Sequence, residues 1–139
     1  MNITIKQVHG LTFIAKGESN HWVNIDGPKQ FNGSEAASRP MELLLMSLGS
    51  CTGSDVVTIL QKKRAAFEKM EIMVTGERKQ DHPKVFTSIH VEYIFYGDDL
   101  EEKDVKRAIE LSQNKYCPVS AMLKESCKLS YSYQIKTTQ

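Results

Sequence analysis

The sequence predicts an α+β protein whose elements follow the order βββ–α–ββ–αα–β. Two observations predict this class. Apolar residues alternate near both ends of the chain, which is typical of half-buried strands. The stretch Pro40–Lys63 is largely apolar and has no internal proline, which predicts one long helix. At 139 residues the chain has the size of one domain, so we expect a single domain over residues 1–139.

The N-terminal part of the chain predicts three short strands joined by turns, and hence an antiparallel meander. Ile3 and Ile5 give the first strand an apolar face. The expected strands cover residues 2–8, 11–16 and 21–26, and the polar stretch 27–38 is expected to be a loop.

The C-terminal part predicts a β-hairpin, two helices and a last strand. The strongest strand signal of the chain, over 85–96, is expected to pair with 71–79. Asp98 and Asp99 offer a helix N-cap, with glutamates three residues on as in a capping box. The remaining expected elements are helices over about 100–115 and from Pro118, and a strand over 128–136.

Composition narrows the classes of partner. The formal charge is +1 and the basic residues are spread along the chain, so we expect no nucleic-acid partner. The first ten residues lack the layout of a signal peptide. The apolar run 43–48 is far shorter than the about 20 residues of a membrane span. We therefore expect a cytoplasmic protein without a membrane partner.

The long predicted helix is interrupted by a group of small residues around Cys51. Gly49 and Gly53 lie in this gap. Each costs about 1 kcal/mol relative to alanine in a helix interior, which predicts a close approach to the backbone there. The helix is apolar on nearly all sides, so we expect it to be buried.

Three cysteines without a dense framework indicate reduced thiols in a cytosolic protein. Cys117 precedes Pro118 at an expected helix start, a setting that favours a thiolate. Cys51 has no helix terminus near it, so any activation has to come from a tertiary neighbour. Each cysteine could equally be a buried small hydrophobe, and for Cys127 we prefer that reading.

No cofactor or metal is expected. The sequence has no CxxC motif and no glycine-rich phosphate loop. Its four histidines stand at no ligand spacing; they are His9, His21, His82 and His90.

Two segments resemble the OsmC/Ohr superfamily: RPMELLLMSLGSC, ending at Cys51, and KYCPVSAML, around Cys117. The resemblance covers essentially the whole chain and is strongest to a branch of short bacterial OsmC-like proteins. It implies an intertwined homodimer in which antiparallel sheets wrap around long central helices, with a site at the dimer interface.

The resemblance also implies an activity. Family members with known activity are thiol peroxidases that act on organic hydroperoxides in oxidative or osmotic stress defence. Cys51 would attack the peroxide and become a sulfenic acid, and Cys117 would resolve it as a disulfide. A dithiol donor would then reduce this disulfide.

The chain departs from the family at two further positions. Active members hold the thiolate with an arginine from the N-terminal strands and a glutamate early in the long helix. No arginine precedes Arg39 here, and the glutamate position falls on Met41. Arg39 and Glu42 are therefore the candidates, although Glu42 points about 180° from Cys51 unless the helix begins after it. Asp55, one turn after Cys51, would raise the pKa of the thiol.

Whether the protein is an enzyme stays open at this stage. The peroxidase hypothesis predicts that Cys51 lies close to Cys117 and has a lowered pKa. The alternative is a non-catalytic stress or ligand-binding protein with an apolar pocket around Cys51, lined by Met41, Met46 and Tyr116. A purely structural homodimer is the third reading. All three share the dimer, because so apolar a helix needs more cover than one small sheet provides.

Overall fold

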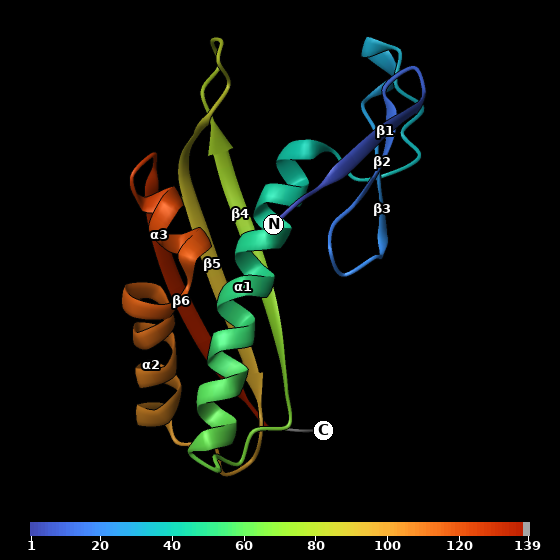
Figure 1. The fold of residues 1–139 in the computed structure, drawn as a ribbon. Helices are drawn as coiled ribbons and strands as arrows, with labels where there is room; N and C mark the ends of the chain where they lie inside the picture. Colours follow the sequence, from blue (N-terminus) through green and yellow to red (C-terminus); the bar gives the residue numbers. More distant parts are fainter. Residues whose placement is uncertain (138–139) are drawn as a thin grey trace. The chain divides into compact units, whose positions relative to one another are not determined.

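The computed structural model describes residues 1–137 and has three helices and two small sheets (Figure 1). The chain forms two compact units, Met1–Leu44 and Leu45–Gln139, which are described separately below. The mixed α+β class and the order of the elements are as predicted. That the whole chain is a single domain stays a prediction.

The first unit holds a three-stranded antiparallel meander, as predicted. The strands are β1 (Thr4–His9), β2 (Thr12–Lys16) and β3 (Trp22–Ile25), in the order β1–β2–β3. A 3-10 turn, η1 (Lys29–Phe31), lies in the following loop. Every residue of β1 is exposed, so the predicted apolar face of this strand is uncovered within one chain.

Helix α1 (Pro40–Lys62) begins at the predicted proline and ends one residue before the predicted end. Leu48, Val56 and Leu60 are fully buried on one side, whereas Met46 is exposed. The expectation of a helix buried all round is therefore wrong for the single chain. By length and composition α1 could cross a membrane, but its fully buried leucines identify it as the core helix of a soluble fold.

The second unit is built on the sheet β4–β5–β6. The strands are β4 (Lys69–Arg78), β5 (Phe86–Tyr96) and β6 (Lys128–Lys136), with β5 in the centre. Strands β4 and β5 form the predicted hairpin. Strand β6 runs parallel to β5, so this sheet is mixed. We had expected antiparallel sheets, and for this sheet that expectation is wrong. The helical connection between the two strands permits the parallel pairing, which a short turn cannot make.

The inner face of this sheet forms the core. Ile89, Val91, Tyr93 and Phe95 alternate along β5 and are all buried. Figure 1 shows α1 and α2 on the same side of the sheet. The ammonium of Lys63, just after α1, lies 2.6 Å from the Asp104 carboxylate of α2 and ties the two helices together.

The segment between β5 and β6 differs in detail from the prediction. Helix α2 (Glu102–Leu111) is followed by a π-helical turn, η2 (Ser112–Tyr116), and by α3 (Pro118–Lys124). The N-cap of α2 is Glu101, without a side-chain cap, so the predicted capping by Asp98 or Asp99 is wrong. The π turn is a variant of helical backbone that has no signature in the spacing of apolar residues.

Candidate thiol site

Cys117 is the N-cap residue of α3, as its position before Pro118 predicted. Its sulfur accepts a hydrogen bond from the backbone N–H of Ser120 at 3.3 Å. The side chain is almost completely buried. The free N–H groups of a helix start therefore face this thiol.

Cys51 is half-buried on α1 and lies beside Cys117. Both are free thiols. The backbone N–H of Val119, in the first turn of α3, is a hydrogen-bond partner of the Cys51 sulfur. The start of α3 thus donates a hydrogen bond to each of the two sulfurs. The tertiary neighbour that Cys51 lacked in the sequence is this segment.

The electrostatic setting of Cys51 is the opposite of what the peroxidase hypothesis predicted. Burial raises the pKa of the Cys51 thiol, and the hydrogen bond with Cys117 raises it further. The N–H of Val119 lowers this pKa and the nearby Asp55 carboxylate raises it, as expected from its place one turn later. The prediction of a lowered pKa at Cys51 is therefore wrong, because one N–H donor does not offset burial and negative charge.

The glycines of α1 lie where the helix packs closely on β4. A Cβ at Gly53 would lie 2.7 Å from Ile72 Cδ1, and one at Gly49 would lie 3.1 Å from Val74 Cγ2. The predicted close approach to the backbone is confirmed, and the approaching group is the sheet. The gap therefore serves the packing of helix on sheet, which removes the observation that suggested a ligand pocket there.

Two pockets border the helical elements of the second unit. One, of about 420 Å³, is lined by η2 and α3 residues that include Cys117 and Lys124. The other, of about 340 Å³, is lined by residues of α1 and α2 and by Tyr116. Tyr116 lines both pockets, whereas Cys51, Met41 and Met46 line neither of them. Neither pocket is therefore the one around Cys51 that the ligand-binding alternative predicted.

A buried polar network forms around Thr52, the residue after Cys51, and the sequence analysis missed it. Thr52 Oγ1 lies 2.6 Å from the hydroxyl of Tyr93 and 2.8 Å from that of Ser112. The amide of Gln113 donates to both Thr52 and Tyr93. Ser112 also donates to Asp55 Oδ2 at 2.9 Å. One signal was available, because Ser112 falls on the otherwise apolar face of its helix.

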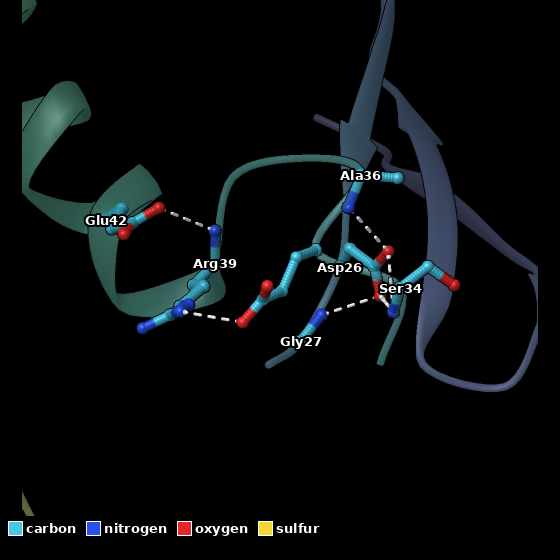
Figure 2. A network of polar contacts seen from close by, with 7 residues as sticks. Asp26, Gly27, Ser34, Ala36, Arg39 and Glu42 are labelled. Carbon is cyan, nitrogen blue, oxygen red and sulfur yellow. Dashed lines mark hydrogen bonds and ion pairs between the residues drawn. The ribbon is translucent and has the colours of Figure 1, made fainter. Parts of the chain in front are cut away.

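Arg39 and Glu42, the other two candidates, lie in the first unit (Figure 2). The Arg39 guanidinium is half-exposed and lies 3.8 Å from the Glu35 carboxylate. Glu42 Oε2 accepts a hydrogen bond from the Arg39 backbone N–H at 2.9 Å. Glu42 is inside α1 and caps its start, so the condition that the helix begins after Glu42 is not met.

Asp26 organises the loop that leads to Arg39, and sequence reasoning did not single it out. Its carboxylate is buried and accepts backbone N–H bonds from Gly27, Ser34 and Ala36, as Figure 2 shows. These bonds, led by that from Gly27, lower the pKa of Asp26. Aspartate followed by glycine and proline is a turn sequence, and this was the available signal.

The remaining reactive side chains have structural partners. The Cys127 thiol donates to the carbonyl of Leu123 at 3.4 Å, and burial raises its pKa. Both ring nitrogens of His90 hydrogen-bond serines of β6. Within residues 1–137, no group of three metal-binding side chains occurs.

Fold and site together define a mixed α+β protein with two free thiols at the start of a short helix. Residues 32–132 match the family model described as OsmC-like protein, and the chain belongs to this family. It is 39% identical to protein YhfA of Escherichia coli strain K12 over 135 residues, covering 97% of this chain and 98% of YhfA.

Solved structures show the same fold. A hypothetical protein from Aquifex aeolicus VF5 is 36% identical with a TM-score of 0.87, covering 99% of this chain and 97% of that one. An organic hydroperoxide resistance protein from Legionella pneumophila has a TM-score of 0.69 at 13% identity, covering 96% and 97%. At that identity the second likeness concerns the fold alone.

Proposed function

We propose that this protein is a thiol-dependent peroxidase that reduces small organic hydroperoxides in the cytoplasm, in oxidative or osmotic stress defence. The observation that carries the proposal is the contact of Cys51 with Cys117 at the start of α3. Membership of the OsmC-like family supports a peroxide-related stress role. One structural relative is an organic hydroperoxide resistance protein.

The chemistry needs only these two thiols and an external reductant. The Cys51 thiolate attacks the terminal oxygen of ROOH, the O–O bond breaks, and the alkoxide leaves as ROH after taking a proton. Cys51 is then a sulfenic acid. The Cys117 thiol attacks this sulfur, a disulfide forms and water leaves. A dithiol donor returns both cysteines to thiols and is itself oxidised to a disulfide.

The setting of Cys51 predicts a slow enzyme at neutral pH. The thiolate is the nucleophile, and burial holds the pKa of Cys51 above its ordinary value. Below that pKa the thiolate fraction rises about tenfold per pH unit. The rate of peroxide reduction should therefore increase steadily from neutral to alkaline pH.

Oxidation by peroxide can be followed directly on the protein. The reduced protein, freed of reductant, receives an equimolar amount of cumene hydroperoxide, and its thiols and intact mass are followed for minutes. We expect loss of two thiols and about 2 Da, with the disulfide mapped to Cys51 and Cys117. Cys117→Ser should stop the reaction at a sulfenic acid that dimedone traps. Thiols that persist under excess peroxide at alkaline pH would contradict the proposal.

Arg39 and Glu42 belong to this proposal as the basic and acidic groups that assist the reaction. Arg39→Ala should slow the loss of thiols. Arg107→Ala is a matched control, because the Arg107 guanidinium also lies 3.8 Å from a glutamate carboxylate on the surface, that of Glu110. Equal rates for Arg39→Ala, Arg107→Ala and the wild type would remove Arg39 from the proposal, and Glu42→Gln tests the acidic group in the same way.

The proposal includes a homodimer. The first unit exposes Ile5, Val8, Trp22 and Phe31, each by 47% or more, and the long helix leaves Met46 exposed. Apolar surface of this extent is typical of an interface between protein chains. A second copy of the chain accounts for it and for the incompletely buried helix. Sedimentation as a stable monomer near 15.7 kDa would contradict this part.

A further inference from the structure

Ser112 joins the helix that carries Cys51 to the segment that carries Cys117. It is fully buried at the first position of the π turn η2. Its hydroxyl donates to Asp55 Oδ2 on α1 at 2.9 Å. Its backbone carbonyl accepts from the N–H of Cys117 at 2.9 Å. A single small residue therefore connects a carboxylate beside one thiol with the backbone of the other.

The hydrogen-bond chain that ends at Asp55 has a fixed direction. An ionised carboxylate only accepts, so the single hydrogen of Ser112 is used on Asp55 at 2.9 Å and not on the Thr52 carbonyl, which lies farther away at 3.4 Å. The 2.8 Å contact then requires Thr52 to donate to Ser112, and the 2.6 Å contact requires Tyr93 to donate to Thr52. Burial raises the pKa of Tyr93, which keeps this terminal donor protonated.

The Asp55 carboxylate, one helical turn after Cys51, is also one of the groups that act on this thiol, and its contribution is the smallest of those named. The others are the Cys117 side chain and the backbone N–H of Val119. A negative charge beside a thiol disfavours its thiolate, and the strength of this effect depends on how closely the charge is held. A half-exposed aspartate without a fixed donor could turn toward water, where its field is screened.

We propose that Ser112 is a positioning residue, which holds the Asp55 carboxylate on the side of α1 that carries Cys51 and so raises the pH at which the Cys51 thiol becomes nucleophilic. The inference rests on the proposed function in one respect, since it describes the regulation of that same thiol. The carbonyl of Ser112 also accepts the hydrogen bond from the Cys117 N–H, so the same residue is tied to the segment that carries Cys117. The Asp55 charge adds to burial and to the contact with Cys117, which favour the protonated Cys51, and it therefore further restrains the reactivity of this thiol.

The test is the pH dependence of alkylation at Cys51. Iodoacetamide labelling rates are measured between pH 6 and pH 11 and assigned to Cys51 by peptide mass mapping. We expect Asp55→Asn to lower the midpoint by about half a pH unit, because the Asp55 charge is the smallest of the named contributions at Cys51. Ser112→Ala should lower it by a smaller amount, because the carboxylate stays in place but is no longer held. Ser112→Thr, which keeps the hydroxyl, should retain the wild-type midpoint.

The double variant and a control decide between positioning and general loosening. If Ser112 acts through Asp55, adding Ser112→Ala to Asp55→Asn should produce no further shift. Ser54→Ala is the control, because this exposed hydroxyl next to Asp55 donates to the Ser50 carbonyl of its own helix. It should leave the midpoint unchanged.

Two results would overturn the inference. One is a wild-type midpoint in folded Asp55→Asn, which decides the matter even where Ser112→Ala fails to fold. The other is a shift by Ser112→Ala that is as large without the Asp55 carboxylate as with it. Alkylation needs no peroxide, so failure of the peroxidase proposal would show separately, as thiols that resist hydroperoxide in a protein whose midpoint still shifts.

Discussion

Asp26 in the first unit and Cys51 in the second are both acceptors that lie close to backbone N–H groups, yet their electrostatic settings are opposite. The Asp26 carboxylate accepts from three backbone N–H groups and from the hydroxyl of Thr12, and its pKa is lowered. The Cys51 sulfur has one backbone N–H partner, and its pKa is raised.

The comparison shows that burial alone does not decide whether an acidic group is charged. Three aligned N–H donors outweigh the desolvation of Asp26, because each stabilises only the ionised form. One donor at Cys51 does not outweigh burial combined with the charge of Asp55 and the contact with Cys117. Asp26 therefore carries a charge at neutral pH that organises a loop, whereas Cys51 carries a proton that has to leave before the thiol can react.

Removing the Asp26 carboxylate should have the largest effect on this comparison. Asp26→Ala leaves the N–H groups of Gly27, Ser34 and Ala36 without their acceptor in a buried place. We expect amide hydrogen exchange at Ser34 and Ala36 to become about tenfold faster or more. Exchange in β5, in the other unit, is the internal control. Unchanged exchange at both amides would mean that the loop is held by other contacts.

The pH dependence of Asp26 supplies a second check with a definite sign. The pKa of Asp26 is lower in the folded protein than its ordinary value of about 3.9. Its contribution to stability is therefore fully present above about pH 4 and is lost as the pH falls through the lowered folded value. The urea midpoint should fall more steeply below pH 4 in the wild type than in Asp26→Asn. Parallel curves would contradict the assigned direction.

Some of the elements that carry these residues could be predicted from the sequence, and others could not. The start of α1 at Pro40 and the place of Cys117 before α3 follow from proline, whose effects are local. The β4–β5 hairpin follows from alternation within each strand. The direction of β6 and the π turn before Cys117 depend on tertiary packing and left no local pattern.

The chemistry of the thiol was less predictable than its position. The motif around Cys51 indicated the pairing with Cys117, but the pKa depends on burial and on donors from distant segments. The contact with Val119 spans more than sixty residues of sequence, and no periodicity reports it. Ser112 was visible as a polar residue on an apolar helix face, but its contact with Thr52 and the contact of Thr52 with Tyr93 left no local pattern.

Disruption of the buried polar network around Thr52 should have the next largest effect. Thr52→Val removes a buried hydroxyl that contacts Tyr93, Ser112 and Gln113. We expect the free energy of unfolding to fall by about 1–3 kcal/mol, because buried donors and acceptors lose a partner. Thr58→Val is the matched control on the exposed side of α1, where the hydroxyl donates to the Ser54 carbonyl of its own helix. It should change stability by less than about 0.5 kcal/mol. Equal effects in urea titrations would show that the network does not stabilise the core.

The smallest effect on stability is expected when the hydrogen bond to the Glu102 carboxylate is removed. Glu102 accepts this hydrogen bond at the protein surface. The hydroxyl of Tyr133 donates to Glu102 Oε1 at 2.8 Å, and this hydrogen bond raises the pKa of Tyr133. Any stabilisation is therefore present below the ordinary tyrosine pKa of about 10 and is lost at higher pH. Tyr133→Phe should leave the urea midpoint at pH 7 within experimental error, because water replaces the lost partner. A clear decrease in the urea midpoint would mean that one surface donor stabilises a carboxylate as effectively as the enclosed N–H groups around Asp26. The number of donors would then not explain why the pKa of Asp26 is lowered and that of Cys51 is raised.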